Sequence, residues 1–227
     1  MSRCAPDAPC IVALIPAYNE QDRIADTVHA VLSIECVDRV IVIDDGSQDY
    51  TAHVAEQAGA KAVRNARNVG KGGALNEAAR RSEDADIILL LDGDLGKSAA
   101  QAITLLEPVI ANEADMTIAT FPAAGKAGFG LVKDLATKAI VRTGAGFFPT
   151  APLSGQRALT RECLDAILPF ASGYGAEVTL TVRALRAGFR LLEVETTMTH
   201  AATGRDLSGF IHRGKQYIDV WWAIRKL

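Results

Sequence analysis

The chain has 227 residues, 49% of them hydrophobic and 22% charged, which favours one large domain or one domain with a small extension. The longest purely apolar run, Ile87 to Leu91, is far shorter than the ~20 residues of a membrane-spanning helix, and the first ten residues show no secretory signal. The net charge of −3 argues against a general nucleic-acid binder. Four cysteines without CxxC spacing predict reduced thiols and a cytoplasmic location.

The first half alternates short apolar runs with segments of helical periodicity. Strands are predicted over residues 11–15, 39–43, 61–64 and 86–91, the first of them ending before Pro16. Helices are predicted from about residue 20, over 51–58 and over 73–81. This alternation indicates βαβ units and a parallel sheet, whose ligands bind at the carboxyl ends of the strands. Polar clusters follow three of these strands, namely Tyr18-Asn19-Glu20, Asp44-Asp45-Gly46-Ser47 and Asp92-Gly93-Asp94.

The second half is less regular. Helices are predicted over 99–110, 129–140 and 176–187, and strands over 116–120, 156–159 and 189–194. No internal repeat or linker interrupts the chain. We therefore predict a single α/β domain, a mostly parallel Rossmann-like sheet flanked by helices, with a C-terminal helical extension.

Basic residues gather at the end of this acidic chain. Residues 200–227 carry five basic side chains against two acidic ones. Such a tail suits an anionic ligand or the anionic inner face of a membrane, and a solvated helix face is the alternative. Apolar residues at helical spacing predict an amphipathic helix over 207–227. Its Trp221 and Trp222 are more typical of core or homodimer contacts than of membrane anchors.

Asp92-Gly93-Asp94 places two carboxylates at the end of a predicted buried strand. Residues i and i+2 of a near-extended turn point the same way, so both carboxylates can reach one point, and Gly93 lets a ligand approach the main chain. Such oxygen donors suit Mg²⁺ or Mn²⁺, with phosphate oxygens and water as the other ligands. The metal would neutralise the charge of a diphosphate leaving group. The alternative is a surface turn or a helix cap.

Three further features could contact the same ligand. Asp45 can accept hydrogen bonds from a nucleobase or a ribose, and Ser47 beside it is also a candidate N-cap for the helix over 51–58. Gly70 opens the main chain before a helix, and Lys71 offers a positive charge for phosphate. Glu177 could be a general base or orient an acceptor. The alternative for Asp45 and Ser47 is an ordinary turn, and that for Gly70 and Lys71 is a plain loop. Glu177 could instead be an acid that the helix dipole favours at a helix N-terminus.

Four motifs together resemble the family 2 glycosyltransferases of the GT-A fold: Ile15-Pro16-Ala17-Tyr18-Asn19-Glu20, Ile43-Asp44-Asp45-Gly46-Ser47, Asn68-Val69-Gly70-Lys71-Gly72 and Leu91-Asp92-Gly93-Asp94. Their order and spacing match over roughly residues 10–120. The resemblance implies a nucleoside pocket lined by Pro16, Ala17, Tyr18 and Glu20, with Asp45 on the base or ribose. It also implies that Lys71 contacts the donor and that Asp92 and Asp94 hold the metal. Ser47, Gly70 and Gly93 complete the candidate donor contacts.

The second half is similar to a narrower group, the retaining glucosyl-3-phosphoglycerate synthases and their relatives, over residues 152–162 and 173–178. In that group a His after the following strand is a further metal ligand, and His200 occupies that place. Acceptor contacts are implied around Ser154, Gly155 and Arg157, and we add Glu177 to them. Gln156-Arg157 stands where the group has Glu-Tyr.

These features predict a metal-dependent glycosyltransferase that moves a hexose to a small phosphorylated or hydroxyl acceptor, with UDP-glucose as the donor by resemblance. Asp94, Lys71 and Glu177 are the predicted catalytic residues, and retention or inversion is left open. We expect a tail over 1–9, a donor half over 10–120 and an acceptor half of the same domain over 121–206. The alternatives are a polyprenyl-phosphate glycosyltransferase at the membrane surface and a non-catalytic nucleotide-sugar binding module. A dinucleotide oxidoreductase is disfavoured because no GxGxxG follows the first strand.

Overall fold

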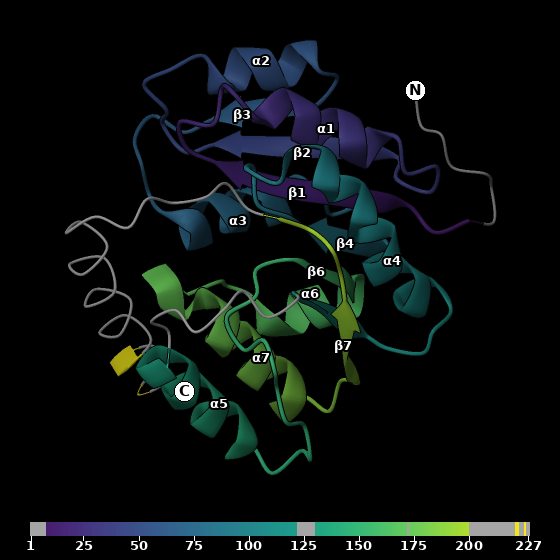
Figure 1. Cartoon of the computed structure of the whole chain (residues 1–227), viewed down its shortest axis with the longest axis vertical. Helices are drawn as coiled ribbons and strands as arrows, with labels where there is room; N and C mark the ends of the chain where they lie inside the picture. Colours follow the sequence, from purple (N-terminus) through teal and green to yellow (C-terminus); the bar gives the residue numbers. More distant parts are fainter. Residues whose placement is uncertain (1–7, 122–129, 172, 200–220, 223–224, 226–227) are drawn as a thin grey trace.

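The computed structural model describes residues 8–121, 130–171, 173–199, 221–222 and 225. These residues form one sheet in the strand order β3-β2-β1-β4-β6-β5-β7 (Figure 1). Neighbouring strands are parallel except that β6 runs antiparallel to both β4 and β5. The predicted mostly parallel sheet is therefore confirmed. Its strands are β1 (Ile11–Ala17), β2 (Arg39–Asp44), β3 (Lys61–Arg64), β4 (Ile87–Leu90), β5 (Met116–Thr120), β6 (Arg157–Thr160) and β7 (Leu191–Glu195).

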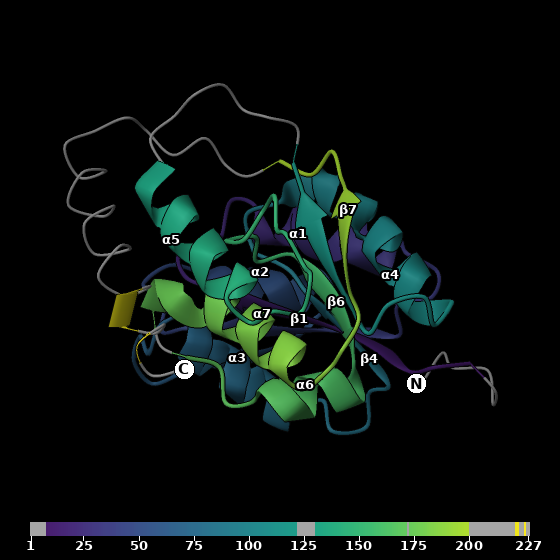
Figure 2. The same ribbon diagram turned by 90° about the horizontal axis from the view of Figure 1, so that it is seen from below.

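Helices cover both faces of the sheet. Figure 2 shows α3, α6 and α7 gathered on one side and α1 and α4 on the other. The 3₁₀ helix η1 (Gly96–Ala102) runs directly into α4, and α5 packs on α7. The remaining bounds are α1 (Ile24–Leu32), α2 (Thr51–Gln57), α3 (Lys71–Arg80), α4 (Ile103–Ile110), α5 (Gly130–Val141), α6 (Arg161–Ile167), η2 (Gly173–Gly175) and α7 (Ala176–Arg186).

The central strands are buried on both faces, which explains their continuous apolar sequences. In β1, Ile11, Ala13 and Ile15 pack with α1 and α4, whereas Val12 and Leu14 pack with α3, α6 and α7. Successive side chains of a strand point to opposite faces, so one apolar run serves two cores. The sheet therefore has its helices on both sides and its ligand-binding edge at the strand ends.

Several predicted boundaries differ from the structure. The helix expected from residue 20 begins at Ile24, and the helix expected from 73 begins at Lys71. The segment 99–110 is a 3₁₀ helix followed by α4, and α6 was not predicted. The first strand continues through Pro16 to Ala17. Because β1 pairs with β4 only up to Leu14, Pro16 lies beyond that ladder, and its missing N–H is tolerated there.

The predicted capping role of Ser47 is wrong. Helix α2 starts after Tyr50, whose own side chain makes no capping hydrogen bond. Instead, Asp49 Oδ1 accepts a hydrogen bond from the main-chain N–H of Thr51 at 3.0 Å. Ser47 lies three residues before the N-cap residue Tyr50, and its hydroxyl accepts a hydrogen bond from Asn19 in the loop after β1.

Two predictions fall outside the described residues. His200 is one of them, and most of the predicted helix over 207–227 is the other. Trp221 and Trp222 are described as helical, with ring centroids 5.2 Å apart. Within the described parts of the chain, no helix has the length and apolar character needed to cross a membrane.

Candidate active site

The loops that follow β1 and β2 are fastened to each other at the carboxyl edge. The main-chain N–H of Asn19 donates to Ser47 Oγ at 2.9 Å, and that of Glu20 donates to Thr51 Oγ1 at 2.8 Å. Ser47 is 1% exposed, so its hydroxyl joins the two loops from within. Tyr18, which follows Pro16 and Ala17 at the end of β1, is 43% exposed. Its ring is therefore available to a planar ligand such as a nucleobase.

Asp45 fastens the loop that leads to α3. Its Oδ1 accepts from Asn65 Nδ2 at 2.8 Å and from the N–H of Val69 at 2.9 Å, and its Oδ2 accepts from the N–H of Gly70 at 2.7 Å. A carboxylate offers about four acceptor positions, so room is left for one more donor. Asp45 thus holds the loop, and its contact with a nucleoside stays a prediction.

Gly46 allows that loop to lie against the end of β2. Its φ is +77°, and a Cβ at this position would lie 2.8 Å from the carbonyl carbon of Arg67. Both the conformation and the close approach exclude a larger residue. The glycine therefore brings the segment before Lys71 to the strand edge.

Lys71 connects the first half of the chain to the second. Its Nζ lies 2.6 Å from Asp92 Oδ1 and 3.1 Å from Glu177 Oε1. Burial lowers the pKa of Lys71, but the charges of Asp92 and Glu177 outweigh burial and raise the pKa above its usual value. The side chain is still 32% exposed. Lys71 is therefore a fixed cation that a phosphate can reach.

Asp92 is held from two sides. Lys71 occupies Oδ1, and Gln156 Nε2 donates to Oδ2 at 2.6 Å. Gly155 lies against this pair, because a Cβ on it would collide with Lys71 Nζ and come within 3.4 Å of Asp92 Oδ2. The predicted residues Lys71, Asp92, Gly155 and Glu177 are therefore brought together at one place.

Asp94 and Glu20 add negative charge beside Asp92. Burial raises the pKa of Glu20, and the charge of Asp94 raises it further, while Arg23 opposes this effect. A divalent cation would relieve this excess charge, and carboxylate oxygens are the donors that Mg²⁺ and Mn²⁺ prefer. The residues present therefore fit the predicted metal.

The described side chains supply only part of a metal site. Among them no three His, Cys, Asp or Glu side chains form a complete set of ligands. This agrees with the habit of Mg²⁺, which takes one or two protein carboxylates and completes its shell with phosphate oxygens and water. His200, the third predicted ligand, lies outside the described residues.

Arg157, which was predicted to contact an acceptor, is 0% exposed. Its Nε donates to the carbonyl of Ser154 at 3.0 Å, its Nη2 to the carbonyl of Glu177 at 3.2 Å and its Nη1 to Thr181 Oγ1 at 2.8 Å. Burial lowers the pKa of Arg157 to about 10, so the group stays charged at neutral pH. The guanidinium faces the interior. Arg157 therefore supports the main chain at Ser154 and Glu177 and does not contact an acceptor directly in this conformation.

The segment before Ser154 is held from β7. The carboxylate of Glu193 accepts hydrogen bonds from the main-chain N–H groups of Thr150 and Ala151, both at 2.8 Å, and from Thr150 Oγ1 at 2.6 Å. Ser154 itself is buried. Strand β7 and Arg157 thus fix the two ends of the turn that carries Gly155.

Sequence reasoning did not assign site roles to Gln156 and Glu193. Gln156 stands within a quoted motif, but its hydrogen bond to Asp92 links residues 64 positions apart. Glu193 lies in a strand and serves a loop 42 residues earlier. A partly polar strand next to a predicted site is a signal for Glu193, whereas nothing local points to the contact of Gln156.

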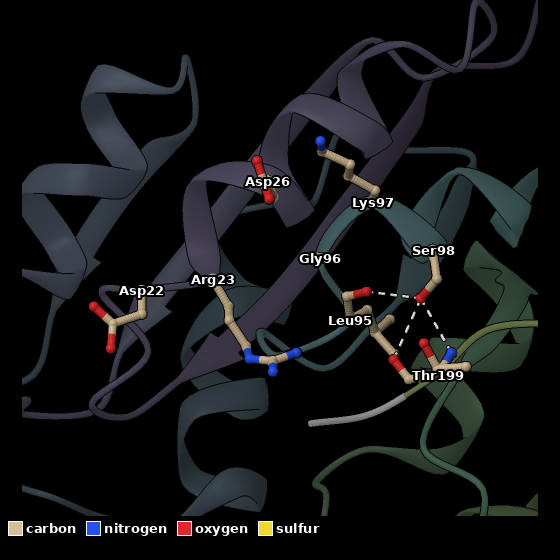
Figure 3. Close-up of a pocket in the computed structure, with 8 residues that line it drawn as sticks. All are labelled: Asp22, Arg23, Asp26, Leu95, Gly96, Lys97, Ser98 and Thr199. Carbon is tan, nitrogen blue, oxygen red and sulfur yellow. Dashed lines mark hydrogen bonds between the residues drawn. The ribbon is translucent and has the colours of Figure 1, made fainter. Parts of the chain in front are cut away.

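An open depression of about 690 Å³ adjoins the same edge. Figure 3 shows it between α1 and the start of η1, with Arg23 and Asp26 on one side and Ser98 and Thr199 on the other. Ser98 Oγ donates to the carbonyl of Leu95 at 2.7 Å and accepts from the N–H of Thr199 at 3.1 Å. The segment after β7 is thereby fastened next to the loop that carries Asp94.

Fold and site together define an α/β protein whose carboxyl edge gathers the Lys71 ammonium and several carboxylates. The model of the family described as "Glycosyl transferase family 2" matches residues 12–173. This chain therefore belongs to glycosyl transferase family 2, and its sheet and helices have the GT-A arrangement of that family.

Individual relatives agree with this assignment. Glycosyltransferase AglJ of Haloferax volcanii is 34% identical over 88% of this chain and 66% of its own length. A glucosyl-3-phosphoglycerate synthase of Mycolicibacterium paratuberculosis is 31% identical over 76% of this chain and 59% of its own length. The chain thus spans less than two thirds of both relatives.

A solved structure is similar over nearly the whole chain. It is the glucosyl-3-phosphoglycerate synthase of Mycobacterium tuberculosis in complex with Mn²⁺, UDP-glucose and phosphoglyceric acid. The two chains are 25% identical with a TM-score of 0.76, and the match covers 96% of this chain and 80% of that one. That enzyme holds the metal and the donor class that the residues of this chain predict.

Proposed function

We propose that this protein is a metal-dependent hexosyltransferase that uses a UDP-linked sugar, UDP-glucose first, and a small phosphorylated or hydroxyl acceptor. The observation that carries the proposal is the Lys71 ammonium, held 2.6 Å from Asp92 and 3.1 Å from Glu177 at the edge of the sheet. It joins a phosphate-binding cation to a carboxylate suited to the acceptor. Related proteins that bind UDP-glucose and Mn²⁺ support the donor class.

The first half of the chain would hold the donor. Tyr18, Asp45 and Glu20 would surround the nucleoside, and Pro16, Ala17, Ser47, Gly70 and Gly93 would line its pocket with their main chain. Lys71 would bind the diphosphate, and its raised pKa keeps it charged throughout the physiological range. Electrostatic stabilisation of a departing diphosphate is usually a large part of such catalysis.

Asp92, Asp94 and His200 would hold the divalent cation. When bound, the cation neutralises charge on the leaving diphosphate. Lys71 and Gln156 contact the two carboxylate oxygens of Asp92, so Asp92 would also position Lys71.

The acceptor would approach from the side of Ser154, Gly155 and Glu177. In the reaction the bond between the anomeric carbon and the diphosphate oxygen breaks, and an acceptor oxygen bonds to that carbon. In an inverting reaction Glu177 takes the proton of the acceptor hydroxyl, whereas in a retaining reaction the departing phosphate takes it and Glu177 orients the acceptor. NMR of the anomeric configuration of the product distinguishes the two.

Two residues at the acceptor side differ from those of the similar synthases. Gln156 contacts Asp92 and Arg157 is buried, at the two positions where the similar synthases carry Glu and Tyr. This difference at the acceptor side favours an acceptor other than phosphoglycerate. A panel should therefore contain 3-phosphoglycerate, other small phosphorylated acids and a short polyprenyl phosphate.

The test measures UDP released from UDP-glucose with Mn²⁺, with and without each acceptor. We expect acceptor-stimulated release that disappears in EDTA and in Asp94→Ala. The matched control is Asp165→Asn, an exposed acid on α6 far from the site, which should keep wild-type turnover. Undiminished turnover of Asp94→Ala would contradict the proposed metal role. Binding of UDP-glucose without release for any acceptor would favour the non-catalytic binding module.

A further inference from the structure

Thr27 of α1 lies at the centre of the contact between that helix and the loop that carries Asp92 and Asp94. Its side chain is fully buried among apolar neighbours. Ile24 and Val28 of the same helix pack in one core cluster with Leu95 and Ala99. A hydroxyl in such surroundings is costly unless it is hydrogen-bonded, so its contacts define what it does.

The Thr27 hydroxyl bridges two main-chain groups of the loop. Oγ1 accepts from the N–H of Gly96 at 2.8 Å and donates to the carbonyl of Gly93 at 2.9 Å, which is closer than its other acceptor, the carbonyl of Arg23 at 3.2 Å. These two residues flank Asp94 and Leu95. One side chain therefore fixes the loop on both sides of the predicted metal ligand.

Few other side chains could replace this bridge. Arg23 Nη1 lies 3.5 Å from the carbonyl of Asp94, at the limit of a hydrogen bond and on the exposed side of the loop. Gly93 has no side chain of its own, and a Cβ there would lie 3.3 Å from Ala17 Cβ. The path of the loop is thus set from α1, through a threonine distant in sequence.

We infer that Thr27 is a positioning residue for the metal site, acting through the Gly93 carbonyl and the Gly96 N–H to hold Asp94 in the orientation for ligation. The inference rests on the proposed function, because it concerns the same cation. Mutating a residue that orients a metal ligand without touching the metal typically lowers metal affinity roughly 10- to 100-fold. Thr27 itself does not touch metal or substrate.

The chain offers a matched set of variants. Thr27→Val keeps the shape of the side chain and removes the hydroxyl, and Thr27→Ser keeps the hydroxyl. Thr117→Val in β5 is the control, because Thr117 is also a fully buried threonine, which donates to the carbonyl of Leu105 at 2.7 Å and accepts from the N–H of Ala158 at 3.3 Å. It lies away from the metal loop, so it reports the cost of losing a buried hydroxyl as such.

The experiment titrates Mn²⁺ into each full-length variant with saturating UDP, following free Mn²⁺ by electron paramagnetic resonance. We expect Thr27→Val to bind Mn²⁺ roughly 10- to 100-fold more weakly than wild type. Thr27→Ser and Thr117→Val should bind close to wild type, although Thr117→Val loses stability against urea. Equal Mn²⁺ affinity for Thr27→Val and wild type would overturn the inference.

A second measurement covers the case in which Thr27→Val folds poorly. Hydrogen exchange of the Gly96 amide should be slow in wild type and in Thr27→Ser, and faster in Thr27→Val or in Thr27→Ala. Unchanged exchange in both hydroxyl-free variants would overturn the bridge. A wild type that binds no Mn²⁺ with UDP would contradict the proposed function itself, which distinguishes that failure from a failure of Thr27.

Discussion

Gly155 lies where Lys71, from the first half of the chain, approaches the main chain of the second. A Cβ at this position would collide with Lys71 Nζ, the far end of a flexible side chain. We predict that Gly155→Ala displaces the ammonium while leaving the fold intact. A displacement of about 1 Å in a catalytic group can cost ~100-fold in rate, so kcat/KM for the donor should fall by roughly that factor.

The control for this change is Gly130→Ala at the start of α5, where a Cβ would meet nothing within 4 Å. Turnover of that variant should match wild type. Steady-state kinetics and urea unfolding of both variants make the comparison. A Gly155→Ala protein with full activity would show that Lys71 need not occupy its observed place.

The sequence indicated the charged residues of the candidate site, but it did not indicate the side chains that hold the surrounding main chain in place. A glycine-rich segment before a helix indicated Lys71, a strand end indicated Asp92 and the start of a helix indicated Glu177. The structure places both carboxylates within 3.1 Å of Lys71 Nζ. The sequence could not predict that Arg157 is buried, because an arginine after Gly-Gln carries no local sign of burial. The partners of Arg157 come from a turn and a helix that only the fold places around it.

Strand β6 and helix α7 are joined by the Arg157 guanidinium. Lysine cannot reproduce its planar set of donors, so Arg157→Lys should lose one or more of the hydrogen bonds to the Ser154 carbonyl, the Thr181 hydroxyl and the Glu177 carbonyl. We predict a loss of about 1–3 kcal/mol in the free energy of unfolding together with a fall in kcat. Urea unfolding and steady-state kinetics measure the two effects.

Arg161→Lys provides the matched comparison for that variant. Arg161 also donates to main-chain carbonyls, those of Ser82 and Ala85, but on α6 away from the site. Stability should fall and kcat should not. If both variants lost activity equally, Arg157 would have no special relation to the acceptor side.

The starts of β5 and β7 are tied by Asp115 and Arg190. Arg190 Nη2 lies 2.8 Å from Asp115 Oδ1, and this hydrogen bond lowers the pKa of Asp115 below its usual value. A carboxyl group with a lowered pKa stabilises the fold above its unfolded pKa and loses that effect as the pH falls through the folded pKa. Asp115→Asn should therefore lower Tm at pH 7.

The pH dependence is the distinctive part of this prediction. The difference in Tm between wild type and Asp115→Asn should shrink as the pH falls through the lowered pKa of folded Asp115, because below that pH Asp115 is protonated in both the folded and the unfolded chain. Calorimetry at a series of pH values measures it. A difference that stays constant down to acid pH would assign the effect to lost shape and not to charge.

Elements with a strong local signal were predicted, and those defined by distant contacts were not. The apolar runs of β1, β2 and β4 show burial on both faces directly. Helix α6 has seven residues and one visible cap, the Thr160 hydroxyl that accepts from the N–H of Cys163 at 3.2 Å. So short a segment has almost no periodicity. The antiparallel position of β6 between β4 and β5 follows from pairing across the chain and has no local sign.

Because the donor and the cation would share one site between the two halves of the chain, we expect them to bind cooperatively. A ligand that binds only the folded state raises Tm, because it stabilises that state by an amount that grows with the logarithm of its concentration divided by its dissociation constant. Mn²⁺ with UDP should therefore raise Tm by more than the sum of their separate effects. In Glu177→Gln this joint shift should persist, because Glu177 belongs to the acceptor side, whereas in Asp94→Ala it should disappear.

In the proposed site, Asp94 binds the cation and Lys71 binds the diphosphate of the same nucleotide-sugar donor. A crystal structure with Mn²⁺ and UDP tests it most directly, since anomalous scattering locates the manganese without ambiguity. We expect a manganese peak at roughly 2.0–2.2 Å from an Asp94 carboxylate oxygen, with the UDP phosphates in contact with Lys71 Nζ. Manganese bound away from Asp94, or UDP bound away from Lys71, would contradict it.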